Sequence, residues 1–213
     1  MKPILFNTEM VRAILDGRKT VTRRIVKPQL ECFGPNIAYT DHEADFFFDA
    51  NVGRLRCRVC GCFPQYSREG TEVSHYWEPP YKPGDVIYVR ETWAELPCGY
   101  VYCADDECPE GWDCDDRWRP SIHMPKELAR LFLRVKDVRI ERLNDMTEED
   151  AIAEGFPDAP AGEDSPLERF SQLWDKTIKP GERDVYGWYG NPYVWVIEFE
   201  NVSYEEAVTD ILC

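Results

Sequence analysis

Regular apolar patterns occur only in separated parts of this chain, and this distribution most constrains how it can fold. Residues 28–83 and 97–120 lack sustained periodicity and contain eight of the nine cysteines. Periodic segments lie before, between and after these two stretches. We therefore expect one domain over residues 1–213, with cysteine-containing insertions at about 28–83 and 97–120.

Three segments have the spacing and the end signals of helices. Apolar residues at helical spacing predict a helix over residues 8–16, which Gly17 ends. Capping boxes that begin at Thr147 and Ser165 predict two later helices, the first of them ending near Gly155. A proline-started segment at residues 125–130 predicts a further short helix.

Four segments are rich in β-branched and aromatic residues and predict strands, at residues 21–25, 86–89, 131–140 and 193–199. The alternation slips phase within the third segment, which predicts a bulge near Lys136 and Asp137. The order of these elements indicates an α+β fold, a small β-barrel with helices at its ends.

Charge is unevenly distributed. The net charge of −15 argues against a protein that coats DNA through a basic surface. Residues 1–30 nevertheless carry seven basic and two acidic side chains, a local charge of +5. This basic island suits a small anionic ligand or one short stretch of nucleic acid, or it is simply a solvated turn.

The first residues argue for a cytoplasmic protein. Only three consecutive apolar residues precede Asn7, too few for the core of an export signal. The later apolar runs are shorter than the ~18–20 residues that a membrane span needs. We expect no membrane contact and a reducing compartment, where cysteines are buried or bind metal.

The loop that follows the first predicted helix is a candidate for chemistry. After Gly17 it places the ammonium of Lys19 close to the hydroxyls of Thr20 and Thr22. A lysine activates a threonine nucleophile when burial or neighbouring cations lower the lysine pKa. The neighbouring cations are Arg18, Arg23 and Arg24. Later in the chain, Glu154 falls in the last turn of its predicted helix, where a proton-transferring acid is favoured.

Four segments together resemble the ASCH domain family, whose fold is similar to that of PUA domains. They are residues 14–24 (ILDGRKTVTRR), 83–85 (PGD), 146–151 (MTEEDA) and 193–199 (YVWVIEF). They occur in the family order and bracket nearly the whole chain. The amino-acid sequence around Trp93 and over residues 120–125 is most similar to that of larger members encoded by bacteriophages and prophages.

The resemblance implies a PUA-like barrel with a cleft for RNA or a nucleoside. Small members of the family include amidohydrolases that remove the acetyl group from N4-acetylcytidine. Carried over by position, their catalytic residues correspond to Lys19, Thr22 and Glu154. Lys19 would activate Thr22, and Glu154 would hold the substrate base or move a proton, with no catalytic cofactor. Arg23 stands where those enzymes have a β-branched residue.

A binding protein of phage origin is the alternative. Arg18, Arg23 and Arg24 could clamp phosphate, while Trp93 offers a surface on which a base stacks or else fills the core. His123 is either a base in the cleft or, as we favour, a structural residue. A host protein that docks on the acidic insertions is a third possible partner.

The cysteines allow a structural zinc site. Cys57 and Cys60 have the Cys-x2-Cys spacing of a zinc knuckle, which supplies two of four ligands. Several residues are eligible as the other two ligands: Cys32, Cys62, His42, His75, Cys103, Cys108 and Cys114. Unligated thiols remain equally compatible with this pattern.

Overall fold

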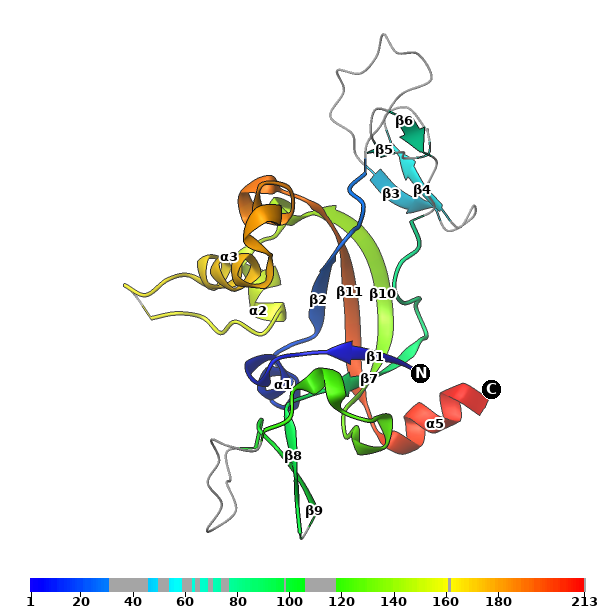
Figure 1. Ribbon diagram of the computed structural model, residues 1–213, viewed down its shortest axis with the longest axis vertical. Coiled ribbons are helices and arrows are strands. Elements are labelled where there is room, and N and C mark those ends of the chain that lie inside the picture. Colours follow the sequence, from blue (N-terminus) through cyan, green and yellow to red (C-terminus); the bar gives the residue numbers. More distant parts are fainter. Residues whose placement is uncertain are drawn as a thin grey trace.

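The protein is built around a five-stranded sheet with the order β1-β7-β10-β11-β2 (Figure 1). The computed structural model describes residues 1–30, 46–49, 54–58, 63, 66–68, 71–73, 77–97, 99–105, 118–160 and 162–212. The strands of the sheet are β1 (Lys2–Leu5), β2 (Val21–Ile25), β7 (Val86–Arg90), β10 (Phe132–Arg142) and β11 (Tyr193–Val202). The pairing of β1 with β7 is parallel, and the other pairings are antiparallel.

Strands β10 and β11 form the long curved centre of the sheet (Figure 1). Their register shifts between Val135 and Asp137, which confirms the predicted bulge. Strand β1 was not predicted, because Ile4 is its one buried position and four residues are too few for an alternating pattern.

The three capped helices are confirmed: α1 (Thr8–Leu15), α2 (Glu148–Ala153) and α3 (Pro166–Thr177). Each begins at a side-chain cap, which is Asn7 for α1, Thr147 for α2 and Ser165 for α3. The structure adds two helices that were not predicted, α4 (Arg183–Tyr186) and α5 (Tyr204–Leu212). The segment 125–130 forms only the 3-10 turn Lys126–Leu128.

The two faces of the sheet pack against different elements. On β11, Trp195 and Ile197 belong to the core that includes α1 and β1, whereas Val194 and Val196 belong to the core beneath α2 and α3. The alternation follows from the two-residue period of a strand. Each fully buried Val or Ile contributes about 1.5–3 kcal/mol. Strand β2, at the edge of the sheet, pairs with β11, and its Val21 belongs to the core beneath α2 and α3.

The described parts of the expected insertions form short hairpins (Figure 1). Their strands are β3 (Phe46–Asp49) with β4 (Arg54–Cys57), β5 (Tyr66–Arg68) with β6 (Thr71–Val73), and β8 (Trp93–Leu96) with β9 (Gly99–Tyr102). Phe46 and Leu55 are buried in the main core, and the Phe46 ring lies 5.3 Å from that of Tyr193. Hairpin β3–β4 thus contributes to the core of the sheet.

The mixed α+β class is confirmed. The hydrogen-bonded order has two ends, β1 and β2, and within the described residues no strand ladder joins them into a closed barrel. A side-chain bond spans this opening, because Arg24 Nη2 on β2 donates to the carbonyl oxygen of Leu5 at 3.0 Å. In the same residues, no helix is both long and apolar enough to cross a membrane.

Candidate functional site

A pocket of about 250 Å³ lies along β2, between the end of β1 and the α2–α3 layer. It is lined by Leu5, Phe6, Asn7, Met10, Lys19, Thr22, Arg23, Arg24, Glu154, Phe156, Phe170, Leu173, Trp174 and Thr177. The structure therefore brings the three residues implied as catalytic, Lys19, Thr22 and Glu154, into one pocket. We call this set of lining residues the β2 pocket.

Lys19 and Glu154 form the most enclosed contact of the β2 pocket. Their side chains are 1% and 5% exposed, and Lys19 Nζ lies 2.5 Å from Glu154 Oε2. Nζ also donates to the carbonyl oxygens of Val21 and Glu154, each at 2.8 Å. These contacts use all three protons of the ammonium. Within the described residues, Lys19 makes no hydrogen bond with the Thr22 hydroxyl.

Burial favours the neutral form of Lys19. Loss of hydration lowers the pKa of Lys19 below its ordinary value, and the positive charges of Arg24 and Arg23 act in the same direction. The charge and hydrogen bond of Glu154 oppose the shift without cancelling it. Burial is therefore the main cause of the lowered pKa of Lys19, and the charges of Arg24 and Arg23 contribute a smaller part.

Close backbone packing brings Lys19 to Glu154. Glu154 caps the C-terminus of α2, and Gly155 follows with a φ of +105°. A Cβ on Gly155 would lie 2.8 Å from the Cβ of Ala13 and 3.3 Å from that of Lys19. The end of α1, the loop after Gly17 and the end of α2 therefore meet at a position where only glycine fits without displacement.

Arg23 has a side chain with 0% exposure and is surrounded by carboxylates. Its Nη2 lies 3.3 Å from Asp150 and 3.6 Å from Glu141, and its Nη1 lies 3.5 Å from Glu154 Oε1. Within the described part of the chain, none of its side-chain nitrogens makes a hydrogen bond, and neither does Glu154 Oε1. These contacts are therefore chiefly electrostatic.

Arg24 and Thr22 are two residues apart on β2, so they share the face that packs toward α1 and β1. The Arg24 guanidinium and the Lys19 ammonium each lie 5.3 Å from the centroid of the Phe6 ring. No carboxylate in the described residues lies within ion-pair distance of Arg24. The guanidinium of Arg24 therefore lacks an acidic partner in the part of the chain that the structure describes.

Aromatic rings supply the opposite wall of the β2 pocket. Phe156 lies 5.9 Å from Phe170 edge to face, and Phe170 is stacked 5.8 Å from Trp174. None of Phe6, Phe156, Phe170 and Trp174 was expected from the sequence to line a site. Phe170 and Trp174 have the four-residue spacing of a buried helix face, which does not distinguish a core residue from one that lines a pocket.

Three predicted binding residues lie outside the β2 pocket. Arg18 donates to the carbonyl oxygen of Gly155 at 2.8 Å and pairs with Asp16, so it braces the loop. Trp93 is 4% exposed in β8, where the Arg119 guanidinium lies 4.8 Å from its ring. His123 is exposed in a 3-10 turn.

The zinc site stays a prediction. Cys57 is buried in β4, while Cys60 and most of the other eligible ligands lie outside the described residues. Among the residues that the structure describes, no group of three or more His, Cys, Asp or Glu side chains is placed to hold a metal ion.

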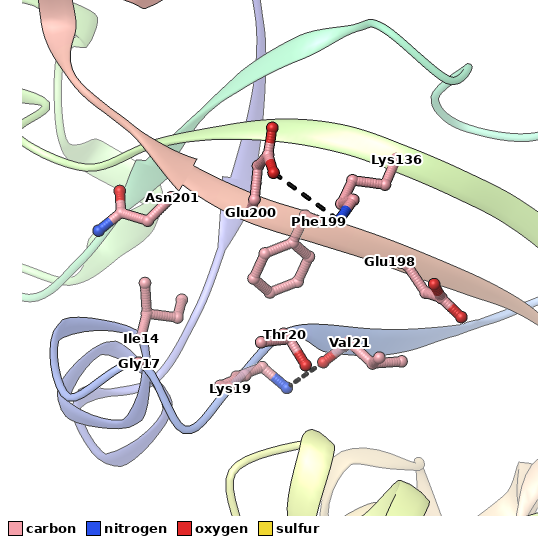
Figure 2. A pocket seen from close by; sticks show the side chains of 10 residues that line it. All are labelled: Ile14, Gly17, Lys19, Thr20, Val21, Lys136, Glu198, Phe199, Glu200 and Asn201. Atoms are coloured by element: carbon pink, nitrogen blue, oxygen red, sulfur yellow. Dashed lines mark hydrogen bonds and ion pairs between the residues drawn. The ribbon is translucent and has the colours of Figure 1, made fainter.

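A second pocket, of about 360 Å³, is lined by the segment from Lys19 to Val21 and by β11 residues from Glu198 to Asn201 (Figure 2). In the view of Figure 2, Lys136 and Glu200 lie above the ring of Phe199. Lys136 Nζ is 3.8 Å from Glu200 Oε2. Lys19 lines both pockets and is buried, whereas the other polar side chains of this second pocket are partly or fully exposed.

No family model and no curated protein matches the chain. Among solved structures, the chain is similar to the crystal structure of a protein from Enterococcus faecalis V583 described under the family model DUF984. The identity is 12% and the TM-score is 0.42, and the match covers 95% of this chain and 82% of that one. The functional assignment therefore rests on the residues of this chain.

Proposed function

We propose that the protein is an amidohydrolase that removes the acyl group from an N4-acylated cytidine. The observation that carries the proposal is the buried Lys19–Glu154 contact at 2.5 Å beside Thr22 in a single pocket. These are the residue types and positions that the resemblance to the ASCH family implies. The proposal includes the PUA-like assignment of the sheet and an intracellular site of action.

The size and chemistry of the β2 pocket support a small, flat ligand. About 250 Å³ lies just below the ~300–1,000 Å³ typical of sites for drug-sized molecules, which fits a single base better than an oligonucleotide. The rings of Phe156, Phe170 and Trp174 offer apolar contact to a base. Glu154 Oε1 is buried 3.5 Å from Arg23 Nη1 and accepts no hydrogen bond within the described residues, so its capacity to accept one from an N–H group of the base is unused.

The proposed reaction passes through an ester of Thr22. As Thr22 Oγ attacks the acyl carbon, its proton moves to the neutral amine of Lys19, which exchanges one of its present contacts for the hydroxyl. The bond between the acyl carbon and N4 then breaks, and Lys19 returns the proton to the departing amine. Water hydrolyses the ester, releasing the carboxylic acid and restoring the Thr22 hydroxyl. Arg24 favours the negative charge that develops on the acyl oxygen.

The test is incubation of the purified protein with N4-acetylcytidine and separation of the products by chromatography. We expect release of cytidine that is lost in Lys19→Ala, Thr22→Val and Glu154→Gln, and that is partly kept in Thr22→Ser. Thr20→Val is the matched control, because Thr20 carries the same hydroxyl two residues away but is exposed and does not line the β2 pocket. Full turnover by folded Thr22→Val would refute the mechanism.

A non-catalytic module that binds RNA or modified nucleic acid is the second candidate. The guanidinium of Arg24, which has no acidic partner among the described residues, favours it by attracting a phosphate. For a single strand, the logarithm of affinity should then fall with the logarithm of salt concentration by about 0.7 per neutralised phosphate. Arg24→Gln should reduce this slope. Binding with that slope and without cytidine release would favour this function over hydrolysis.

A further inference from the structure

Arg23 lines the β2 pocket and is charged, but it has no role in the proposed reaction. Its side chain has 0% exposure, and all three carboxylates within 4 Å lie at 3.3–3.6 Å, beyond good hydrogen-bond geometry. A buried guanidinium loses much of its hydration, so its charge acts strongly on nearby groups. What Arg23 affects therefore depends on which groups lie next to it.

The nearest catalytic neighbour of Arg23 is Glu154. Arg23 Nη1 faces Oε1 of that carboxylate at 3.5 Å, while Oε2 contacts Lys19 at 2.5 Å. The Glu154 carboxylate thus lies between the Arg23 guanidinium and Lys19 Nζ. A positive charge at this position stabilises the carboxylate of Glu154 and disfavours the ammonium of Lys19.

Only one of these effects bears on the protonation of Lys19. The attraction between Arg23 and the Glu154 carboxylate is present whether Lys19 is charged or neutral, so it does not change that equilibrium. The repulsion between Arg23 and the ammonium favours loss of the ammonium proton. The form that remains has a neutral Lys19, which is the form able to accept the proton of Thr22.

We propose that Arg23 is a positioning residue that shifts Lys19 toward its neutral amine, the form that activates Thr22. The inference rests on the proposed hydrolysis of an N4-acylated cytidine. Arg23 itself touches neither the acyl group nor the leaving amine in this mechanism. It acts through the effect of its positive charge on the protonation of Lys19.

The charged groups around the pair divide into two sets. From β2, Arg24 adds a second positive charge that favours proton loss. From α2 and β10, Asp150 and Glu141 face Arg23 at 3.3 and 3.6 Å and partly neutralise it. Glu141 also contacts Arg139 Nε at 2.5 Å, so removing the Glu141 charge leaves the positive charge of Arg139 less compensated, which acts in the same direction on Lys19. Removing Arg23 and removing Glu141 should therefore shift the protonation of the pair in opposite directions, which a merely structural role of these residues would not produce.

The test is the pH dependence of kcat/KM for N4-acetylcytidine in wild type, Arg23→Met, Arg23→Lys and Glu141→Gln. Arg23→Met should move the acidic limb of the profile to higher pH by about one unit or more. Glu141→Gln should move it to lower pH by a smaller amount, and Arg23→Lys should stay near wild type. Glu141→Gln keeps the inference testable if Arg23→Met does not fold.

Coincident acidic limbs in the wild type and Glu141→Gln, or a limb that Arg23→Lys displaces as far as Arg23→Met, would overturn the inference. A direct readout is the ¹⁵N shift of Lys19 Nζ against pH, assigned by its absence in Lys19→Arg. If the wild type releases no cytidine, the proposed function fails. The NMR titrations still decide whether Arg23 and Glu141 control the protonation of Lys19 in opposite directions.

Discussion

The ammonium of Lys19 lies 2.5 Å from the carboxylate of Glu154, although 135 residues separate them in the chain. The contact is buried on both sides and joins the loop after α1 to the C-terminal cap of α2. It therefore serves both the packing of these segments and the proposed chemistry.

Breaking the Lys19–Glu154 pair from one side should destabilise the protein strongly. In Lys19→Met, a buried carboxylate loses its hydrogen-bonded partner, which should lower the free energy of unfolding by about 3–5 kcal/mol. The double variant Lys19→Met/Glu154→Gln should recover part of this loss, because no buried charge remains on Glu154. Urea unfolding at neutral pH measures both. Additive losses in the double variant would mean that the two residues are not energetically coupled.

Gly155→Ala should displace Lys19, whereas Gly162→Ala should not. Both glycines have a positive φ, +105° and +98°, so an alanine is similarly strained at either position. Only at Gly155 would the new Cβ meet Ala13 at 2.8 Å, and nothing lies within 4 Å at Gly162. We expect a loss of about 1–2 kcal/mol at Gly162 and about 1–3 kcal/mol more at Gly155. Equal losses in thermal unfolding would contradict the close packing at the site.

Phe6→Leu should weaken the site more than an equivalent change elsewhere in the core. The Phe6 ring lies 5.3 Å from both the Lys19 ammonium and the Arg24 guanidinium, and leucine cannot replace these cation–π contacts. Phe132→Leu is the control, since Phe132 is 4% exposed and packs on Tyr204 away from the β2 pocket. We expect Phe6→Leu to lose about 1–2 kcal/mol more stability than the control. Cytidine release should fall in Phe6→Leu alone.

Ionisation of Glu91 should make stability fall as pH rises from about 4.5. Burial raises the pKa of Glu91 above its ordinary value of 4.5, although the bidentate contact with Arg130 opposes the shift. Between these two pKa values the folded state holds more protons than the unfolded state, so raising the pH disfavours folding across this window. Wild type should therefore lose stability relative to Glu91→Gln from about pH 4.5 upward. Parallel stability curves for the two proteins in this window would contradict the assignment.

Elements marked by local signals were predicted well. The caps of α2 and α3 depend on neighbouring residues, so the capping boxes at Thr147 and Ser165 predicted where these helices begin. The apolar spacing of residues 8–16 and Gly17 predicted α1. The bulge in β10 was visible as a slip of alternation before Asp137. Strand β1 was missed, because a four-residue edge strand with one buried side chain has no pattern of its own.

The candidate site was only partly visible in the sequence. Lys19, Thr22 and Glu154 were expected from the resemblance to a known family, and they share the β2 pocket. Trp93 was considered as a surface on which a base stacks, whereas the aromatic residues that line the pocket include Phe170 and Trp174. A side chain that lines a pocket and one that fills a core have the same hydrophobic spacing, so periodicity does not distinguish them.

The starts of α1, α2 and α3 and the approximate positions of β2, β7, β10 and β11 could be predicted from sequence, since caps, turns and alternation are set by residues within a few positions of one another. Which charged side chains meet depends on the tertiary fold. Arg23 and Arg24 are adjacent in sequence, yet the strand turns them to opposite faces, one toward three carboxylates and the other toward Phe6. Electrostatic environment depends on distance in space and on exclusion of water, which no local pattern specifies.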